Sequence, residues 1–153
     1  DAQQLAEDIR GELEQMEIVV EELEAIADDV GDGPVTLRDR AAASAFLASF
    51  YMGVENVLKR IARFHGVDLP RGERWHVELF EQFCPPAAAP LPVLFGGELI
   101  SKMDAYRRFR HVIHHGYERD LDYDRMRPGI EGVSGALETF RENVEQYLAA
   151  IER

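Results

Sequence analysis

Apolar residues recur every three or four positions along most of the chain, a spacing that aligns them on one side of an α-helix. In residues 2–30 this stripe consists of Leu5, Ile9, Leu13, Met16, Val20, Leu23, Ala27 and Val30. In residues 36–64 it consists of Phe46, Phe50, Val54, Val57, Ile61 and Phe64. Further apolar residues flank the second stripe, so we expect the second helix to lie at the centre of the fold.

Glycine, proline and capping residues separate the predicted helices. The sequence GDGP (Gly31–Pro34) ends the first helix, and Thr36 followed by Asp39 resembles a capping box that begins the second. A shorter helix is expected over about residues 73–83. The next segment, CPPAAAPLP (Cys84–Pro92), has four prolines and cannot form a regular helix, because proline lacks the N–H donor and restricts the preceding residue.

Two more helices are predicted in the last third of the chain. The first begins near residues 95–98 and runs toward Gly116; its apolar positions are Leu99, Met103, Tyr106, Phe109 and Ile113. The second spans about residues 128–151, with Pro128 in its first turn. No segment shows the alternation typical of a β-strand. The prediction is a single all-α domain over residues 1–153, an antiparallel bundle of four main helices plus a short one.

Charge is distributed unevenly along the 153 residues, whose formal net charge is -12. Residues 1–40 contain thirteen acidic residues and three arginines, whereas residues 100–119 contain five Lys or Arg, two acidic residues and three histidines. An acidic surface repels nucleic acid over most of its area. Because salt screens charges beyond about 8 Å, a polyanion could still bind the basic segment, and we expect any such contact to be confined there.

The remaining composition bears on location. No uninterrupted apolar run of about 18 residues occurs, so we expect no membrane span. The first residues, DAQQLAEDIRGELEQ, resemble no signal peptide. The single cysteine, Cys84, cannot form a disulfide within the chain, which fits a reducing compartment. These features predict a cytoplasmic protein.

The densest chemistry lies in RRFRHVIHHGYERD (Arg107–Asp120), which holds four arginines, three histidines and one tyrosine. At about 100° per residue, Arg110, His114 and Tyr117 share one face of the fourth helix, and Arg107 lies about 60° from Arg110. His111 and His115 lie on the adjoining flank. Cationic and proton-exchanging side chains are therefore predicted to project together from the end of this helix.

Two interpretations of these residues come before any catalytic one: a structural role and a metal site. Basic side chains stabilise the C-terminal end of a helix, and arginines can balance an acidic neighbour such as the first helix; this suits Arg107 and Arg108 better than the histidines. A divalent metal could be held by His111 and His115, four positions apart. A carboxylate ligand set is missing, since the chain has one Glu-x-x-His sequence (Glu73–His76) where a di-iron bundle needs two. We expect no metal and no other cofactor.

Phosphoryl chemistry without a metal is the third interpretation. Arginine binds a phosphate through two parallel hydrogen bonds and stays charged at every relevant pH. Histidine can take a proton from a ribose 2′-hydroxyl and return one to the leaving 5′-oxygen. One arginine and one histidine on a helix make half of such a site. Two chains around a two-fold axis would bring two halves together.

The spacing Arg110-x4-His115-x-Tyr117 matches the R-x4–6-H motif, extended by x-Tyr, of the HEPN superfamily, and the segment resembles the HepT-like ribonuclease toxins in particular. The polar His111 directly after Arg110 also suits that pattern. Members are small all-helical proteins with the motif late in the chain and a long helix after it. The helical layout extends this resemblance over most of the sequence.

The resemblance implies a homodimer whose two motifs form one metal-independent RNase site. Arg110 would hold the scissile phosphate and His115 would act as acid and base, supported by His111, His114 and Arg107; the tyrosine spacing favours His115 over His114. Such proteins are commonly paired with a small nucleotidyltransferase (MNT) antitoxin. It transfers AMP to the motif tyrosine, here Tyr117. The acidic net charge suggests a short, exposed RNA substrate such as a tRNA end or loop.

Three points stay open on sequence alone. The protein could be a HEPN-fold partner that presents Tyr117 to a nucleotidyltransferase without cutting RNA. It could also be a helical adaptor whose basic helix docks on an acidic partner. Trp75 and His76 could line the RNase cleft, but we favour a core or hinge role for them.

Overall fold

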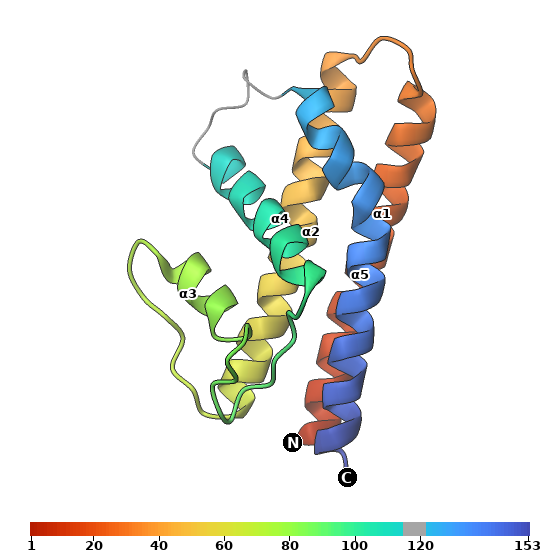
Figure 1. Cartoon of the computed structure of the whole chain (residues 1–153). Coiled ribbons are helices and arrows are strands. Elements are labelled where there is room, and N and C mark those ends of the chain that lie inside the picture. The colour runs from red at the N-terminus through yellow and green to blue at the C-terminus, as the bar shows by residue number, and fades with distance from the viewer. Residues whose placement is uncertain (115–121) are drawn as a thin grey trace.

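The computed structural model describes residues 1–114 and 122–153, and all regular elements within these ranges are helices. They are α1 (Ala2–Val30), α2 (Leu37–Phe64), α3 (Trp75–Glu81), α4 (Glu98–His114) and α5 (Tyr123–Ile151). Four are long and α3 is short (Figure 1). The predicted all-α class, with four main helices and a short one, is confirmed for this part of the chain.

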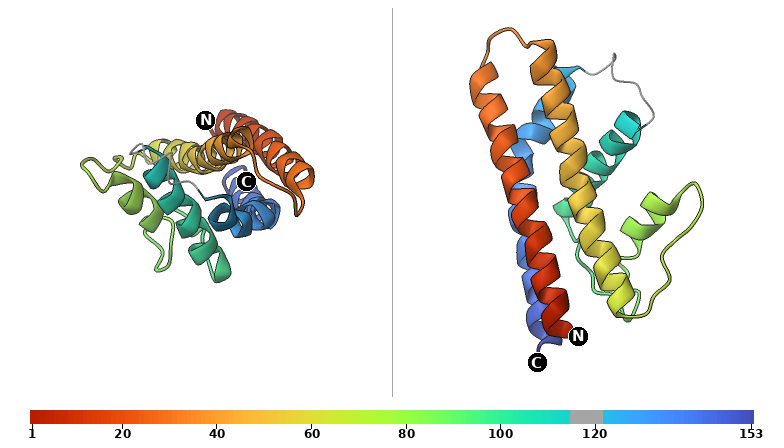
Figure 2. Two further views of the ribbon diagram at one scale, coloured as in Figure 1. Left: turned by 90° about the horizontal axis from the view of Figure 1, so that it is seen from above. Right: turned by 180° about the vertical axis from the view of Figure 1, so that it is seen from behind.

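The long helices pack around α2. Helices α1 and α2 run side by side in opposite directions, and α5 lies against both of them (Figures 1 and 2). Helix α4 crosses α2 and also contacts α5, while α3 packs on α2 alongside α4. The N-terminus and the C-terminus of the chain lie at the same end of the molecule. One hydrophobic core contains buried side chains from all five helices.

The end of α1 and the start of α2 lie where the local sequence signals predicted them. Gly31, at φ 49°, follows the last residue of α1 in a backbone conformation that residues with a Cβ rarely adopt. The capping box is present: the Asp39 N–H donates to Thr36 Oγ1, and the Thr36 N–H donates to the Asp39 carboxylate, both at 3.1 Å. Each bond satisfies an N–H group that would otherwise lack a partner at the start of α2.

The start of α5 differs from the prediction. The helix begins at Tyr123, where the Asp122 side chain accepts the N–H of Asp124, so Pro128 lies inside the helix and not in its first turn. A proline at the sixth position removes one backbone hydrogen bond, and the Asp122 cap offsets part of that loss. Helix α3 is also shorter at both ends than the predicted residues 73–83.

The apolar stripes form the core with few exceptions. Every predicted stripe residue of α1 is buried except Ala27, which is partly buried. In α2, Phe64 is the last residue of the helix and is 39% exposed, and Phe46 is partly buried. Leu91, Leu94 and Phe95 from the proline-rich segment and its continuation are buried, so this non-helical stretch is part of the core. The prediction that Cys84–Pro92 forms no regular helix is confirmed.

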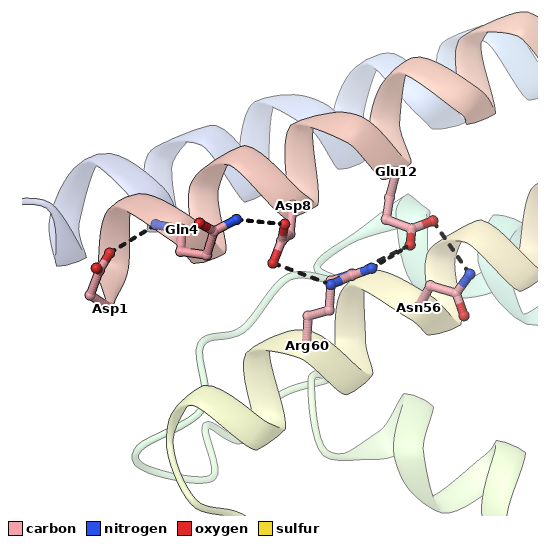
Figure 3. A network of polar contacts seen from close by, with 6 residues as sticks. All are labelled: Asp1, Gln4, Asp8, Glu12, Asn56 and Arg60. Atoms are coloured by element: carbon pink, nitrogen blue, oxygen red, sulfur yellow. Dashed lines mark hydrogen bonds and ion pairs between the residues drawn. The ribbon is translucent and has the colours of Figure 1, made fainter.

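A close contact and a polar seam join α1 to α2. Gly53 faces Met16 so closely that a Cβ at this position would lie 2.4 Å from the Met16 Cγ. At the solvent edge, Arg60 binds Glu12 at 3.1 Å and Asp8 at 3.4 Å (Figure 3). Asn56 donates to the same Glu12 carboxylate, and the seam continues along α1 toward its first residue.

Helix α2 is the one helix in the described ranges whose length and composition would allow it to cross a membrane. Just over half of its most apolar window, 56%, is buried against the rest of the protein. The central helix of a helical bundle has the same composition, so this property is weak evidence for a membrane span.

Candidate functional site

A buried carboxylate marks the site. Glu55 lies on α2 among the apolar residues Tyr51, Val54 and Leu58, and it is 1% exposed. A buried carboxylate requires charged or hydrogen-bonding partners, because burial removes its hydration. Two lie within reach among the described residues: Glu55 Oε2 lies 2.5 Å from Nδ1 of His76, and Glu55 Oε1 lies 3.5 Å from Nη1 of Arg110. Side chains from α2, α3 and α4 therefore meet at one point.

Arg110 also contacts the ring of His76 directly. Its Nη1 lies 3.3 Å from Nδ1 and 3.4 Å from Nε2, and these nearly equal distances indicate contact with the ring as a whole. The Arg110 side chain is 16% exposed, so its position is fixed by neighbours on two sides. A guanidinium has five N–H donors in a rigid plane. The contacts of Arg110 with the described residues run through Nη1, and the other guanidinium nitrogens carry further donors that could bind an anion.

The protonation state of His76 follows from its surroundings. Burial lowers the pKa of His76 below its ordinary value, and the positive charges of Arg110 and Lys59 act in the same direction. The hydrogen bond and the negative charge of Glu55 raise the pKa, but they do not outweigh burial. The ring is therefore neutral at pH 7. In that state one ring nitrogen is a donor and the other an acceptor.

His76 and Arg110 line a cleft of about 190 Å³ between α3 and α4. Its wall consists of Glu73, Arg74, His76, Val77, Arg107, Arg110 and His111. Three arginines and two histidines thus face one small volume in a chain whose net charge is -12. Arginine clusters of this kind bind phosphate groups by charge-assisted hydrogen bonds.

Arg107 and Arg108 share a carboxylate of their own helix. Arg107 binds Asp104 at 2.6 Å, and Arg108, which is 73% exposed, binds the other oxygen of Asp104 at 2.8 Å. Both arginines therefore pair within α4, and neither balances the acidic α1 as one sequence-based alternative held. Arg107 is oriented into the cleft wall by this contact, whereas Arg108 faces solvent.

The tyrosine behind the cluster is fully buried. Tyr51 is 0% exposed, and its hydroxyl has no hydrogen-bond partner among residues 1–114 and 122–153. Burial and the nearby charge of Glu55 raise the pKa of Tyr51, so its hydroxyl stays protonated. Within the described residues, no three His, Cys, Asp or Glu side chains converge in the way a metal site requires.

The structure brings together some of the residues predicted from the sequence. Arg107, Arg110 and His111 line the cleft. His114 is the last residue of α4, and its side chain lies outside the described part of the structure. His115 and Tyr117 also lie outside the described residues, so the pairing of Arg110 with His115 and the role of Tyr117 stay predictions.

Sequence reasoning misjudged His76 and missed Glu55. His76 was expected in a core or hinge role, but it lines the cleft and contacts Arg110, because α3 packs on α2 beside α4. Trp75 is partly buried against the core, as expected. One signal for Glu55 was available: it is an acidic residue within the most apolar helix of the chain, at a position flanked by core residues.

The described part of the chain is all-helical, and arginines and histidines line a cleft beside its penultimate long helix. The family model described as HepT-like protein matches residues 42–151, which include Glu55, His76 and Arg110. The chain therefore belongs to the HepT-like family, as the motif had suggested. No curated protein and no solved structure matches the chain significantly.

Proposed function

We propose that this protein is a metal-independent endoribonuclease toxin that acts as a cytoplasmic homodimer. Membership of the HepT-like family supports this function. The observation that carries it is the cleft, where Arg74, Arg107 and Arg110 converge with two histidines in an otherwise acidic protein. An RNA strand contacts such a protein most favourably where the local charge is positive.

The proposed reaction is cleavage of RNA by its own ribose. Arg110 binds the scissile phosphate and stabilises the charge that develops on it. His115 exchanges protons with the reacting oxygens, supported by His111 and His114. The 2′-oxygen forms a bond to phosphorus and the bond to the 5′-oxygen breaks, leaving a 2′,3′-cyclic phosphate and a 5′-hydroxyl. Two protomers each contribute an Arg110 and a His115 to one composite site.

The surroundings of Arg110 support its role. Its guanidinium is held between Glu55 and the His76 ring at 16% exposure, so little side-chain freedom is lost when an anion binds. Donors that are already oriented stabilise a developing charge without reorganisation, and removing one such donor typically slows a reaction by about 10²–10³-fold. Mobile surface arginines lack this advantage.

Inhibition by a partner follows from the same charge distribution. A nucleotidyltransferase antitoxin of the MNT type transfers AMP to Tyr117, which follows α4 by three residues. The adenylyl phosphate adds negative charge and bulk near the end of the helix that carries Arg107 and Arg110. It would therefore compete with the phosphates of an RNA strand for the same arginines.

Expression of variants in a bacterial host tests the proposal. We expect Arg110→Ala and His115→Ala to relieve growth arrest and to abolish cleavage of total RNA, while circular dichroism and light scattering show a folded dimer. Arg108→Ala is the matched control, because Arg108 lies on the same helix but is 73% exposed and binds Asp104. Continued growth arrest by both Arg110→Ala and His115→Ala would contradict the catalytic assignment.

A non-catalytic partner is the second candidate, and the acidic groups around the cleft favour it. Glu55, Glu73 and Asp104 offset much of the positive charge of the arginines. In that case purified protein leaves RNA intact, whereas incubation with a nucleotidyltransferase and ATP still adds one AMP to Tyr117. Intact-mass spectrometry and an RNA digest of the same sample separate the two functions.

A further inference from the structure

We propose that His76, held by Glu55, is a second acid–base group of the cleft and accepts the proton of the attacking 2′-hydroxyl. The inference rests on the proposed ribonuclease function and assigns it a general base that the R-x4–6-H motif does not include. It starts from three observations: the short contact between His76 and Glu55, the burial of that carboxylate, and the place of the ring in the cleft wall.

Glu55 fixes the orientation of the His76 ring. A carboxylate only accepts hydrogen bonds, so a neutral His76 donates its Nδ1–H to Glu55 Oε2 at 2.5 Å. The proton is then absent from Nε2, which carries the lone pair. A histidine whose Nδ1–H is held by a buried carboxylate is the arrangement by which hydrolases orient a general base and stabilise its protonated form. Glu55 is thus a positioning residue for His76.

Charged residues of α2 and α4, the helices next to α3, surround His76. Helix α2 contributes Glu55 and also Lys59, whose ammonium lies 4.6 Å from the Trp75 ring next to His76. Helix α4 contributes Arg110. Among the described residues, the cleft is also lined by the charged or titratable Glu73, Arg74, Arg107 and His111. Burial together with the cations lowers the pKa of His76, which keeps Nε2 able to accept a proton at neutral pH.

The position of the ring beside Arg110 suits this step. His76 lines the cleft with 22% of its side chain exposed, and Arg110 Nη1 lies 3.4 Å from its Nε2. A phosphate bound by Arg110 would therefore place its adjoining ribose next to the ring. Nε2 takes the proton as the 2′-oxygen bonds to phosphorus, and the proton that neutralises the leaving 5′-oxygen comes from His115. His76 later returns its proton to solvent.

The inference assigns two of the reacting groups to a single protomer. His76 and Arg110 lie on α3 and α4 of the same chain, 34 positions apart, and they already touch in one protomer. A base and a phosphate-binding group are therefore assembled before a second chain joins.

Single-turnover cleavage of a short RNA tests the role of His76 in the full-length protein. We expect His76→Ala to slow cleavage by about 100-fold or more, the usual contribution of a general base. Added imidazole should restore part of the rate, and the affinity for the same RNA with 2′-deoxy sugars should change less than threefold. His65→Ala is the matched control, because His65 contacts Tyr147 and lies outside the cleft.

Each result has a distinct meaning. Cleavage by His76→Ala within threefold of wild type would overturn the inference while leaving the ribonuclease function intact. A slow variant that imidazole fails to rescue and that binds RNA equally poorly would also overturn it, since His76 would then only bind or support the fold. A wild-type protein that cuts no RNA would overturn the proposed function together with this inference.

Nuclear magnetic resonance supplies a measurement that does not depend on cleavage. In ¹⁵N-labelled protein, we expect the His76 ring at pH 7.5 to be neutral with its proton on Nδ1, and Glu55→Gln to shift that ring's titration. His76→Ala assigns the signals by their loss. A proton on Nε2, or a titration unaffected by Glu55→Gln, would contradict the arrangement.

Discussion

Two of the arginine–carboxylate sites among the described residues have similar composition and different surroundings. At the seam between α1 and α2, Arg60 binds Asp8 and Glu12, and its side chain is 38% exposed (Figure 3). In the cleft, Arg110 binds Glu55, and the two side chains are 16% and 2% exposed. The first site joins two helices at their solvent edge, whereas the second lies between the core and a cleft.

This difference separates a structural contact from a candidate reactive one. Exposed ion pairs gain little, because water screens them and ordering two long side chains costs entropy. A buried pair costs desolvation energy that its attraction barely offsets, so its presence calls for a reason other than stability. For Glu55 and Arg110 the reason we infer is that they orient cationic and proton-exchanging groups toward a bound phosphate.

The largest expected difference in the free energy of unfolding is between replacing Glu55 in the buried site and replacing Glu12 at the seam. Glu55→Ala leaves Arg110 partly buried without its carboxylate and should lower the free energy of unfolding by about 3–5 kcal/mol. Glu12→Ala, the matched change at the seam, should cost roughly 1 kcal/mol or less. Urea unfolding at one fixed protein concentration measures both. Equal losses in the two variants would remove the distinction between the sites.

The second largest expected difference is in how the stability of wild type and of the His76 variant depends on pH. Because the folded state lowers the pKa of His76, the unfolded chain binds more protons below the ordinary histidine value of about 6.5. The stabilising contribution of neutral His76 is therefore present above that pH, and it is lost as the pH falls from that value through the lower pKa of the folded state. Wild type should lose more stability between pH 7.5 and 5.5 than His76→Gln does. Arg60→Met, which removes no histidine, should retain the wild-type slope.

The smallest expected effect is at Arg60. Arg60→Met should change the free energy of unfolding by roughly 0–1 kcal/mol, because Arg60 is 38% exposed and water screens its pairs with Asp8 and Glu12. Raising the salt concentration should shrink this difference further. Thermal unfolding of wild type and variant at two salt concentrations gives the comparison. A loss of several kcal/mol would show that the seam stabilises the fold as strongly as the buried cluster.

The helices were largely predictable because their signals are local. The apolar spacing, the capping residues and the helix-ending residues that define a helix lie within a few residues of each other. Thr36 and Asp39 begin α2 in this way, and Gly31 ends α1 directly after Val30. The prediction for α5 was wrong at its start because two signals competed. Proline at the first turn is common, but the Asp122 cap, six residues earlier, began the helix instead.

The candidate site was predictable only in the part that lies on α4. Helical geometry placed Arg107, Arg110 and His111 near one another, and all three line the cleft. Nothing in that geometry shows which surface faces them across the cleft. The counterpart is His76, and its neighbour is Glu55, 21 positions earlier in the chain. A histidine in a short helix has many structural uses, so its type alone gave no reason to prefer this one.

The sequence by itself determined the five helices, most of their ends, their buried faces and the family motif, because each depends on residues close together along the chain. Only the tertiary structure decided that a carboxylate of α2, an imidazole of α3 and a guanidinium of α4 occupy one volume. That choice depends on how the helices pack around Glu55, and packing is set by the summed burial of many side chains, which periodicity alone does not reveal.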